Sequence, residues 1–252
     1  MTTRMATTIW ARVFLAAALL WPASGWAETC RTVEHEARSY AVCEVAAGAD
    51  LRLFLTGADG KPMATFDRLQ ATVEAEGHRL VFAMNGGMYH PDRRPVGLFI
   101  EAGQEVAPLV TSAGPGNFGL QPNGVFCIGE DRFAVVETLA FAAAPPACRD
   151  ATQSGPMLLI GGALHPRFLK DSDSRYIRNG VGVSADGKTA YFVISGGRVN
   201  FDEFARFFRD ALKAPDALYF DGKVSRLYAP EIGRDDIGFP MGPIVGLAAP
   251  GR

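Results

Sequence analysis

"SRYIRNGVGVSADGKTAYFVIS", residues 174–195, is the stretch that decides the fold class of this chain. Two largely apolar runs flank Asp186-Gly187, a dipeptide typical of tight β-hairpin turns because both residues tolerate positive φ. In the first run, Ile177, Val181 and Val183 follow the alternation of a strand that lies in the core. The stretch therefore predicts two antiparallel core strands.

A helix is predicted directly after this hairpin. Asn200 is a favoured N-cap residue, and Glu203 occupies the third helical position of a capping box. Apolar residues then repeat with helical spacing, which predicts one buried stripe, and Pro215 ends the helix. The stripe consists of Phe201, Phe204, Ala205, Phe208, Ala211 and Leu212.

Most of the remaining patterns are strands. They cover residues 39–55 with a turn at 47–50, 79–84, 95–110 with a turn at 102–103, 119–137 with a bend at 129–131, 157–162, and 217–228 with a bend at 221–222. A second helix is predicted over residues 65–77, and residues 141–149 are predicted to form a long loop. Without any βαβ repetition, the pattern favours a single α+β domain with mixed or antiparallel sheets and a few interspersed helices.

The first 27 residues have the features of a cleavable signal peptide. Arg4 and Arg12 precede an apolar run that is much shorter than the ~20 residues of a membrane-spanning helix, and Gly25 and Ala27 fit a signal-peptidase site. We therefore expect a signal peptide at 1–27 and a mature domain at 28–252. We also expect a periplasmic or secreted protein with no membrane insertion after cleavage.

The four cysteines of the mature chain favour disulfides, because an exported protein matures in an oxidising compartment. Four cysteines allow three pairings. We favour Cys30–Cys43 and Cys127–Cys148, since each would join neighbours across one hairpin or loop. The net charge of −2 gives no reason to expect a nucleic-acid partner.

The motifs of nucleotide-binding loops, serine hydrolases and zinc proteases are missing from the sequence, and the four histidines show no metal-ligand spacing. We expect no cofactor and no metal site, while a requirement for a divalent cation and the oligomeric state are left open. What remains is a set of polar residues beside glycines at the ends of predicted strands. They are Asn85, Gly86, Asn123, Gln153, Ser154, Arg175, Arg178, Asp221 and Ser225.

Two of these residues are the strongest candidates for chemistry. Arg178 interrupts a core strand, where a guanidinium needs either an anionic partner or a pocket, because burying it unpaired is costly. That partner could be a substrate or a structural carboxylate, Asp221 or Asp202. Asp221 follows the apolar run "ALYF", and a carboxylate at a strand end suits a base, a nucleophile or a hairpin corner. Asn123 taken alone favours a turn over a binding role.

Six segments together, in this order, resemble the phosphodiester glycosidase family. They are "FAMNGGMY", "NFGLQPNGVF", "TQSGPMLL", "SRYIRNGVGVS", "VNFDEFARFFRDAL" and "ALYFDGKVSRLY", and the likeness extends over roughly residues 50–246. Many relatives carry Asp-Gly-Gly-Gly-Ser where this chain has residues 221–225, Asp-Gly-Lys-Val-Ser. The resemblance implies hydrolysis of a sugar C1–O bond whose leaving group is a phosphate ester.

The same resemblance suggests roles for the candidate residues. Arg178 and Arg175 would bind the phosphate, and Asp221 would face the developing oxocarbenium ion or its attacking water. The substrate-binding set would be Asn85, Gly86, Asn123, Gln153, Ser154 and Ser225. The expected partner is a small-molecule or polysaccharide phosphosugar. Two other functions stay open: a phosphodiesterase that breaks the P–O bond, and a carbohydrate-binding module without turnover.

Overall fold

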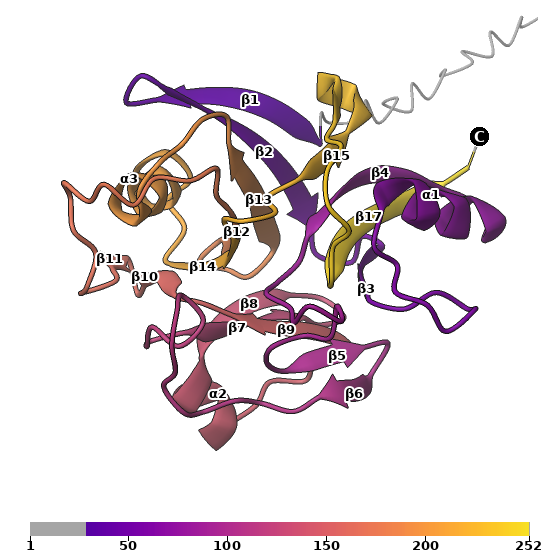
Figure 1. Ribbon diagram of the computed structural model, residues 1–252, viewed down its shortest axis with the longest axis horizontal. Coiled ribbons are helices and arrows are strands. Elements are labelled where there is room, and N and C mark those ends of the chain that lie inside the picture. The colour runs from indigo at the N-terminus through magenta and orange to yellow at the C-terminus, as the bar shows by residue number, and fades with distance from the viewer. Residues whose placement is uncertain (1–28, 252) are drawn as a thin grey trace, which may run out of the picture.

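Three antiparallel β-sheets make up most of the protein in the computed structural model, which describes residues 29–251 (Figure 1). The signal peptide predicted at residues 1–27 lies outside the described residues. The sheets pack around a shared core and are accompanied by a few short helices, so the predicted single α+β domain is confirmed. Among residues 29–251, no helix is long and apolar enough to cross a membrane.

The first sheet has seven strands in the order β1-β2-β13-β12-β14-β10-β11. They are β1 (Cys30–His35), β2 (Arg38–Ala46), β10 (Met157–Ile160), β11 (Ala163–Leu164), β12 (Asn179–Val183), β13 (Thr189–Ser195) and β14 (Asp216–Asp221). β12 and β13 form the hairpin predicted from residues 174–195, with Val181 opposite Phe192.

The second sheet has five strands in the order β16-β15-β4-β17-β3. They are β3 (Leu51–Phe54), β4 (His78–Asn85), β15 (Leu227–Ala229), β16 (Arg234–Asp235) and β17 (Ile244–Pro250). The third sheet also has five strands, in the order β6-β5-β9-β7-β8. They are β5 (Phe99–Glu101), β6 (Gln104–Ala107), β7 (Gly124–Ile128), β8 (Phe133–Glu137) and β9 (Asp150–Ser154).

Each sheet carries one α-helix on its outer side (Figure 1). α3 (Phe201–Arg206) continues into a π-helical turn, η1 (Phe207–Ala211), and begins with the predicted capping box of Asn200 and Glu203. α1 (Phe66–Ala75) lies within the predicted helix at 65–77. α2 (Thr138–Ala143) overlaps the start of the loop predicted at 141–149, and a 3₁₀ turn, η2, covers Pro230–Ile232.

Phe192 of β13 lies at the centre of the shared core. Its ring centroid is 5.3 Å from that of Phe82 in the second sheet and 5.6 Å from that of Phe126 in the third. Alternation along β13 turns the next residue, Val193, to the opposite face, where it packs with α3. Central strands such as β13 are therefore apolar on both faces.

Two of the strand pairs predicted on either side of a turn do not pair with each other, because their strands belong to different sheets. The turn at residues 47–50 does not close the predicted hairpin, because β2 pairs with β1 and β13 whereas β3 pairs with β17. Similarly, β14 lies in the first sheet, while β15 pairs with β4 in the second. The chain from Asp221 to Leu227 therefore crosses the junction between two sheets.

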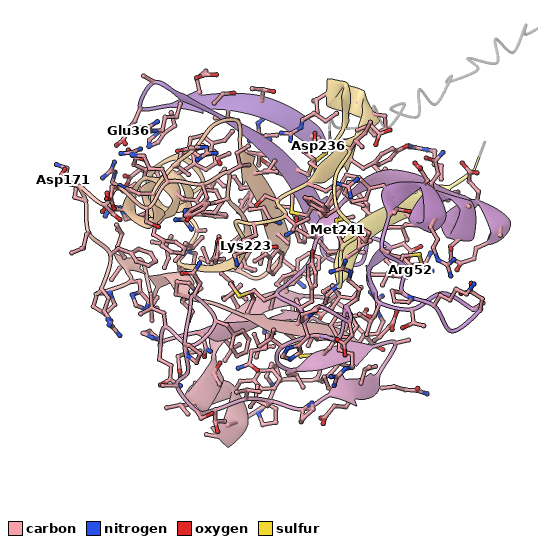
Figure 2. All side chains as sticks on the ribbon, viewed as in Figure 1. Glu36, Arg52, Asp171, Lys223, Asp236 and Met241 are labelled. Carbon is pink, nitrogen blue, oxygen red and sulfur yellow. A yellow bond between two sulfur atoms is a disulfide. The ribbon has the colours of Figure 1, made fainter. Side chains whose placement is uncertain are left out.

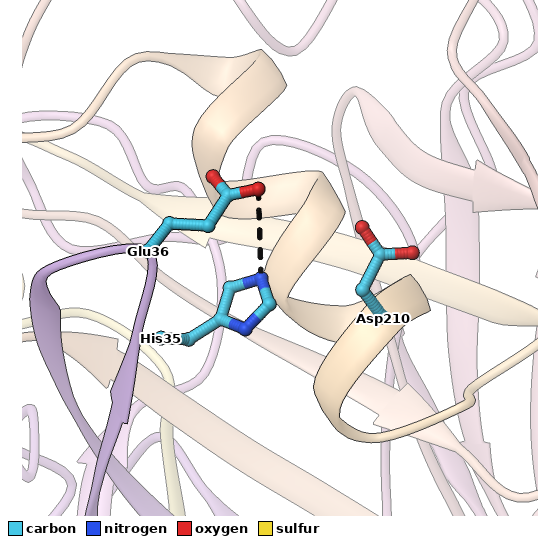
Figure 3. Close-up of side chains that lie close together, drawn as sticks. All are labelled: His35, Glu36 and Asp210. Carbon is cyan, nitrogen blue, oxygen red and sulfur yellow. Dashed lines mark ion pairs between the residues drawn. The ribbon is translucent and has the colours of Figure 1, made fainter.

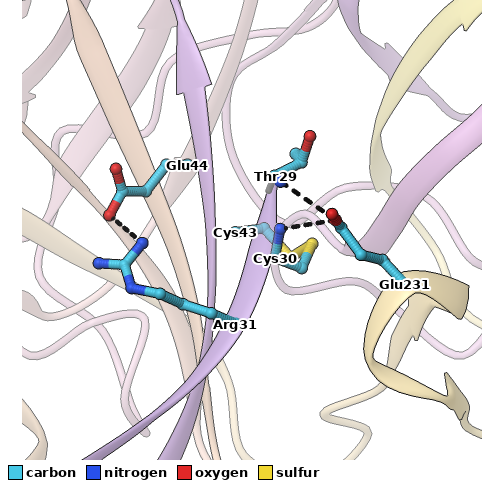
Figure 4. Close-up of a disulfide and its surroundings, with 6 residues drawn as sticks. All are labelled: Thr29, Cys30, Arg31, Cys43, Glu44 and Glu231. Carbon is cyan, nitrogen blue, oxygen red and sulfur yellow. Dashed lines mark hydrogen bonds and ion pairs between the residues drawn. A yellow bond between two sulfur atoms is a disulfide. The ribbon is translucent and has the colours of Figure 1, made fainter. Parts of the chain in front are cut away.

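Both favoured disulfides are present. Cys30 lies opposite Cys43 in the β1–β2 pair and is bonded to it, and Cys127 of β7 is bonded to Cys148. The Glu231 carboxylate accepts hydrogen bonds from the backbone N–H groups of Thr29 (3.1 Å) and Cys30 (2.9 Å) (Figure 4). The start of the described chain is thus tied to the first sheet by a disulfide and to η2 by a carboxylate.

Candidate active site

Asp221 lies where β14 ends and the chain leaves the first sheet. The alternation of β14 points Leu218 and Phe220 into the shared core and Tyr219 towards α3. Oδ1 of Asp221 accepts hydrogen bonds from the backbone N–H groups of Gly222 (2.6 Å) and Lys223 (2.9 Å). This local turn fixes the carboxylate at the end of the strand.

The Asp221 carboxyl is half-buried, and burial raises its pKa. The backbone hydrogen bonds from Lys223 and Gly222 offset only part of that rise. A carboxylate whose pKa moves towards neutrality is a better proton acceptor at physiological pH. The environment of Asp221 therefore favours acid–base chemistry.

A pocket of about 750 Å³ opens beside Asp221. Its walls come from residues 88–96, 115–118, 174–176 and 219–224 and from the loop before β17. The lining residues are Met88, Tyr89, His90, Pro91, Arg93, Val96, Pro115, Gly116, Asn117, Phe118, Ser174, Tyr176, Tyr219, Asp221, Gly222, Lys223, Val224, Phe239 and Pro240. Among these described residues Asp221 is the single carboxylate, so it faces the pocket without an acidic neighbour.

Two permanent cations share the pocket wall with Asp221. Lys223 lies two residues after it, near the middle of the face seen in Figure 2. Arg93 has a left-handed backbone, with φ of 74°, and its guanidinium lies 5.4 Å from the Tyr89 ring centroid. Because this conformation is unfavourable for a residue other than glycine, the surrounding loop must hold it in place. The pocket therefore combines one carboxylate with two positive side chains.

The rim of the pocket is formed by two loops that contact each other. The Tyr89 hydroxyl donates a hydrogen bond to the Pro240 carbonyl (3.2 Å). A Cβ at Gly242 would lie 2.5 Å from the Tyr89 ring, so only glycine permits this approach. Phe239, beside Pro240, is 78% exposed and leaves an aromatic ring at the pocket entrance.

Arg178 lies behind this pocket instead of lining it. The residue is 1% exposed and has no carboxylate partner among the described residues. Nε donates to the Val199 carbonyl (3.0 Å) and Nη2 to the Ser174 carbonyl (2.9 Å), while Nη1 has no hydrogen-bond partner in the described part of the chain. The guanidinium carbon lies 3.7 Å from the centroid of the Phe201 ring. The salt bridge to Asp221 or Asp202 that we considered does not form.

Arg175 is occupied by a structural ion pair. Its Nη1 and Nη2 atoms lie 2.7 Å and 3.0 Å from the two carboxylate oxygens of Glu203, which also binds Arg38 at 2.7 Å. A bidentate pair of this kind holds the guanidinium away from other anions. Arg175 thus has a structural contact at the start of α3, and its phosphate contact stays a prediction.

Asn85 joins the second sheet to the first. Its Nδ2 donates to Oδ1 of Asn179 (3.0 Å), and Nδ2 of Asn179 donates to the Asn85 carbonyl (2.8 Å). Its Oδ1 accepts a hydrogen bond from the Arg226 backbone N–H (3.0 Å). Both asparagines are fully buried. Asn85 therefore fixes the junction that the chain crosses after Asp221.

The third sheet is joined to the other two by further buried hydrogen bonds. Ser154 Oγ donates to the Phe220 carbonyl (3.1 Å), one residue before Asp221. Thr152 Oγ1 donates to the Gly86 carbonyl (2.9 Å), and the Gly86 N–H is already bonded to the Pro243 carbonyl (2.8 Å). Ser154 and Gly86 thus lie at the sheet junction beneath Asp221 instead of lining the pocket.

The other predicted contacts are also used within the protein. Asn123 donates to the Phe118 carbonyl (2.8 Å), although its Oδ1 is buried without a partner in the described residues. Gln153 uses its amide to hold two loop segments around Leu98 and Val110. Ser225 Oγ lies 2.9 Å from the Asp221 carbonyl and 3.0 Å from that of Ile177. Of the nine candidate residues from the sequence, Asp221 alone lines the pocket.

Most of the residues that line the pocket are not among the candidates predicted from the sequence. Arg93 belongs to a loop with a conspicuous cluster of charges, which is a usable signal. Lys223 stands out as the departure from the glycine-rich motif of the family. Tyr219 gave the weakest signal, because one aromatic residue in an apolar run normally indicates core packing.

One group of possible metal ligands lies away from this pocket. His35, Glu36 and Asp210 bring their ligand atoms within 4.8 Å of one another (Figure 3). Both carboxylates already have arginine partners, since Arg206 lies 2.8 Å from Glu36 and Arg209 lies 2.7 Å from Asp210. We therefore assign no ion to this group, and the absence of a metal site stays a prediction.

Comparison with known proteins agrees with the fold. The family model for phosphodiester glycosidase matches residues 78–235, a range that includes Asp221 and most of the pocket wall. The chain therefore belongs to the phosphodiester glycosidase family. Uncharacterized protein YigE of Escherichia coli (strain K12) is 36% identical over 178 residues, which cover 71% of this chain and 69% of YigE.

Two solved structures share the fold. The catalytic domain of zebrafish N-acetylglucosamine-1-phosphodiester alpha-N-acetylglucosaminidase, auto-inhibited by its pro-peptide, aligns with a TM-score of 0.56 at 14% identity. That alignment covers 86% of this chain and 81% of the zebrafish chain. A protein from Burkholderia pseudomallei K96243 aligns with a TM-score of 0.54 at 14% identity, over 83% of this chain and 74% of that one.

Proposed function

We propose that this protein is an exported hydrolase that cleaves the glycosidic C–O bond of a sugar-1-phosphodiester. One observation carries the proposal: a single half-buried carboxylate, Asp221, faces a pocket whose wall also presents Arg93 and Lys223. Membership of the phosphodiester glycosidase family supports the reaction class. The proposed substrate is a small-molecule or polysaccharide phosphosugar.

The chemistry follows from the two ends of such a substrate. Cleavage of the C1–O bond of a sugar phosphodiester releases the phosphate monoester as a stable anion, so the reaction needs little general-acid help and a second catalytic carboxylate is dispensable. Asp221 would act as the base for the attacking water and would stabilise the positive charge that develops at C1. Arg93 and Lys223 would bind the departing phosphate.

The remaining candidates would act through structure. Arg178 would contribute its positive charge from behind the pocket wall instead of binding phosphate directly. Burial lowers the pKa of its guanidinium, yet arginine stays charged because its ordinary pKa lies far above neutrality. Asn85, Gly86, Asn123, Gln153, Ser154 and Ser225 would hold the sheet junction and loops that position Asp221.

Export is part of the proposal. Two disulfides are typical of a protein that matures in an oxidising compartment. The predicted signal peptide at residues 1–27 is consistent with a periplasmic or secreted protein. Mass spectrometry of the protein recovered from the periplasm tests this directly, and a mature N-terminus at Glu28 is the expected result.

The reaction is tested by incubating the oxidised mature protein with UDP-N-acetylglucosamine in ¹⁸O-labelled water. Cleavage of the C–O bond places the label on the free sugar and releases UDP. Asp221→Asn should lower kcat by about 10³-fold, in the range typical of a positioned base. Asp216→Asn is the matched control: Asp216 lies at the other end of β14, about 17 Å away at strand spacing, and also accepts a backbone hydrogen bond.

Each alternative gives a different result. Label on the phosphate, with sugar-1-phosphate and UMP as products, would mean P–O cleavage and would reject the glycosidase. Binding without turnover across a panel of sugar phosphodiesters would indicate a binding module. Asp221→Asn turning over at the wild-type rate would remove Asp221 from the mechanism.

A further inference from the structure

Tyr219 lines the pocket beside Asp221 and carries a phenolic hydroxyl. The residue precedes Asp221 by two positions on β14 and is 1% exposed, yet it lines the pocket. A Cβ added at Gly222 would lie only 2.2 Å from the Tyr219 hydroxyl oxygen. The hydroxyl therefore packs against the backbone of the residue that follows Asp221.

Arg178 lies behind this tyrosine. Its guanidinium carbon is 5.3 Å from the Tyr219 ring centroid and 5.4 Å from that of Tyr176, which also lines the pocket. Its Nη1 atom is the buried nitrogen that has no hydrogen-bond partner in the described residues. Burying an arginine that has no carboxylate partner and an unbonded N–H lowers the stability of the folded protein. The retention of Arg178 here indicates that its positive charge acts on a ligand.

The electrostatics of the hydroxyl agree with this arrangement. Burial raises the pKa of Tyr219, while the positive charge of Arg178 and the side chain of Asn117 oppose the rise. Tyr219 therefore stays protonated at neutral pH and keeps its O–H. An arginine can only donate hydrogen bonds, so any bond from Nη1 to the tyrosine oxygen leaves the phenolic proton free to be donated elsewhere.

We propose that the Tyr219 hydroxyl donates a hydrogen bond to a non-bridging oxygen of the substrate phosphate, with Arg178 as the positioning residue behind it. This inference rests on the proposed function and adds a specific contact to it. The hydroxyl and Asp221 would lie on either side of the scissile bond, one facing the phosphate and the other facing C1. Gly222 is required because a side chain there would displace the hydroxyl.

Tyr219→Phe tests the contact because it removes one oxygen and keeps the ring that packs against Phe201, 4.8 Å away. Tyr40→Phe is the matched control, since Tyr40 is also 1% exposed, lies in the same sheet and packs on the same helix, but does not line the pocket. For UDP-N-acetylglucosamine we expect kcat/KM to fall about 10²-fold in Tyr219→Phe, as when one preorganised donor is removed, and to stay within threefold in Tyr40→Phe. Gly222→Ala should lower kcat/KM by a similar factor to Tyr219→Phe, because the added methyl group would displace the Tyr219 hydroxyl.

Two readouts separate a phosphate contact from a packing effect. Sulfur accepts hydrogen bonds poorly, so wild type should discriminate against one diastereomer of a substrate with sulfur at a non-bridging oxygen of the sugar-bearing phosphate. Tyr219→Phe should lose that discrimination. UDP alone should also bind about tenfold more weakly to Tyr219→Phe, as expected for one hydrogen bond to a charged group. The inference would be overturned if Tyr219→Phe bound UDP as tightly as wild type or kept the discrimination against sulfur. It would also be overturned if wild type did not bind UDP.

The same experiments keep this inference distinct from the proposed function. If wild type binds UDP through Tyr219 but hydrolyses no sugar phosphodiester, the phosphate contact stands and the hydrolase fails. If Asp221→Asn abolishes turnover while Tyr219→Phe behaves like wild type, the hydrolase stands and the phosphate contact fails.

Discussion

Replacing Gln153 by alanine should destabilise the protein strongly and leave its chemistry nearly unchanged. Oε1 of Gln153 accepts hydrogen bonds from the backbone N–H groups of Leu98 and Val110, both at 3.0 Å. Nε2 donates to the Val110 carbonyl (2.7 Å) and to Thr138 Oγ1 (3.1 Å). A glutamine amide has two donors and two acceptor positions, so none is left for a substrate.

The magnitude follows from these four bonds. A buried hydrogen bond contributes about 1 kcal/mol net, so their loss predicts about 4 kcal/mol of destabilisation, with unsatisfied backbone groups adding to it. Urea denaturation should show the loss as a lower midpoint at an unchanged slope. Gln70→Ala is the control, since Gln70 makes one exposed bond to Glu74 on α1 and should change stability by less than about 0.5 kcal/mol.

Kinetics then decide between a supporting and a direct role for Gln153. Under conditions where the variant is folded, kcat and KM for the sugar phosphodiester should stay within threefold of wild type. A Gln153→Ala protein with wild-type stability and a hundredfold loss of kcat would refute the reasoning, because that combination belongs to a residue that touches the substrate.

Three further predictions concern pH, the pocket cations and the disulfides. Burial raises the folded-state pKa of Asp221, so ionising this carboxyl lowers the stability of the protein as pH rises through that pKa. Asp221→Asn should therefore raise the urea midpoint at pH 8 and give no gain below the ordinary aspartate pKa of about 3.9. The reverse trend would count against burial as the cause. Arg93→Gly should keep stability within about 1 kcal/mol, because glycine suits a φ of 74°, but it should raise KM for the phosphodiester about tenfold. Ala102→Gly is the control: it changes a residue with a φ of 50° outside the pocket and should leave KM unchanged. Replacing Cys127 and Cys148 together by serine should lower the free energy of unfolding by about 3 kcal/mol in urea denaturation, since that disulfide closes a loop of 21 residues. A decrease below about 1 kcal/mol would mean that the disulfide constrains the unfolded chain little.

Local structure was the predictable part of the fold. Asp186-Gly187 marks a hairpin turn, and Asn200 with Glu203 marks a helix start, because in each case residues near in sequence create the structure. Partners distant in sequence could not be predicted in the same way. Alternation shows which face of β4 is buried, but it contains no information that pairs Asn85 with Ile244.

In the candidate site, too, local features could be predicted from the sequence and contacts between distant residues could not. Asp221 could be predicted because a carboxylate directly after an apolar strand needs an explanation. The role of Asn85 could not, since an asparagine beside glycine looks the same in a turn, in a pocket and between two sheets. Tyr219 was missed because its neighbours are apolar, and only the structure shows its hydroxyl beside Gly222.

The crossing from β14 to β15 has a consequence for how substrate preference can diverge among related proteins. A hairpin loop must keep a length that preserves the pairing of its two strands, but β14 and β15 do not pair with each other. The side chains at positions 223 and 224 can therefore change in size and charge without shifting the register of either sheet, whereas Gly222 is restricted by its contact with Tyr219. Asp221 stays fixed by its own strand and by the two backbone N–H groups that follow it. We expect other residues at positions 223 and 224 to alter which phosphate esters are accepted while the fold is retained.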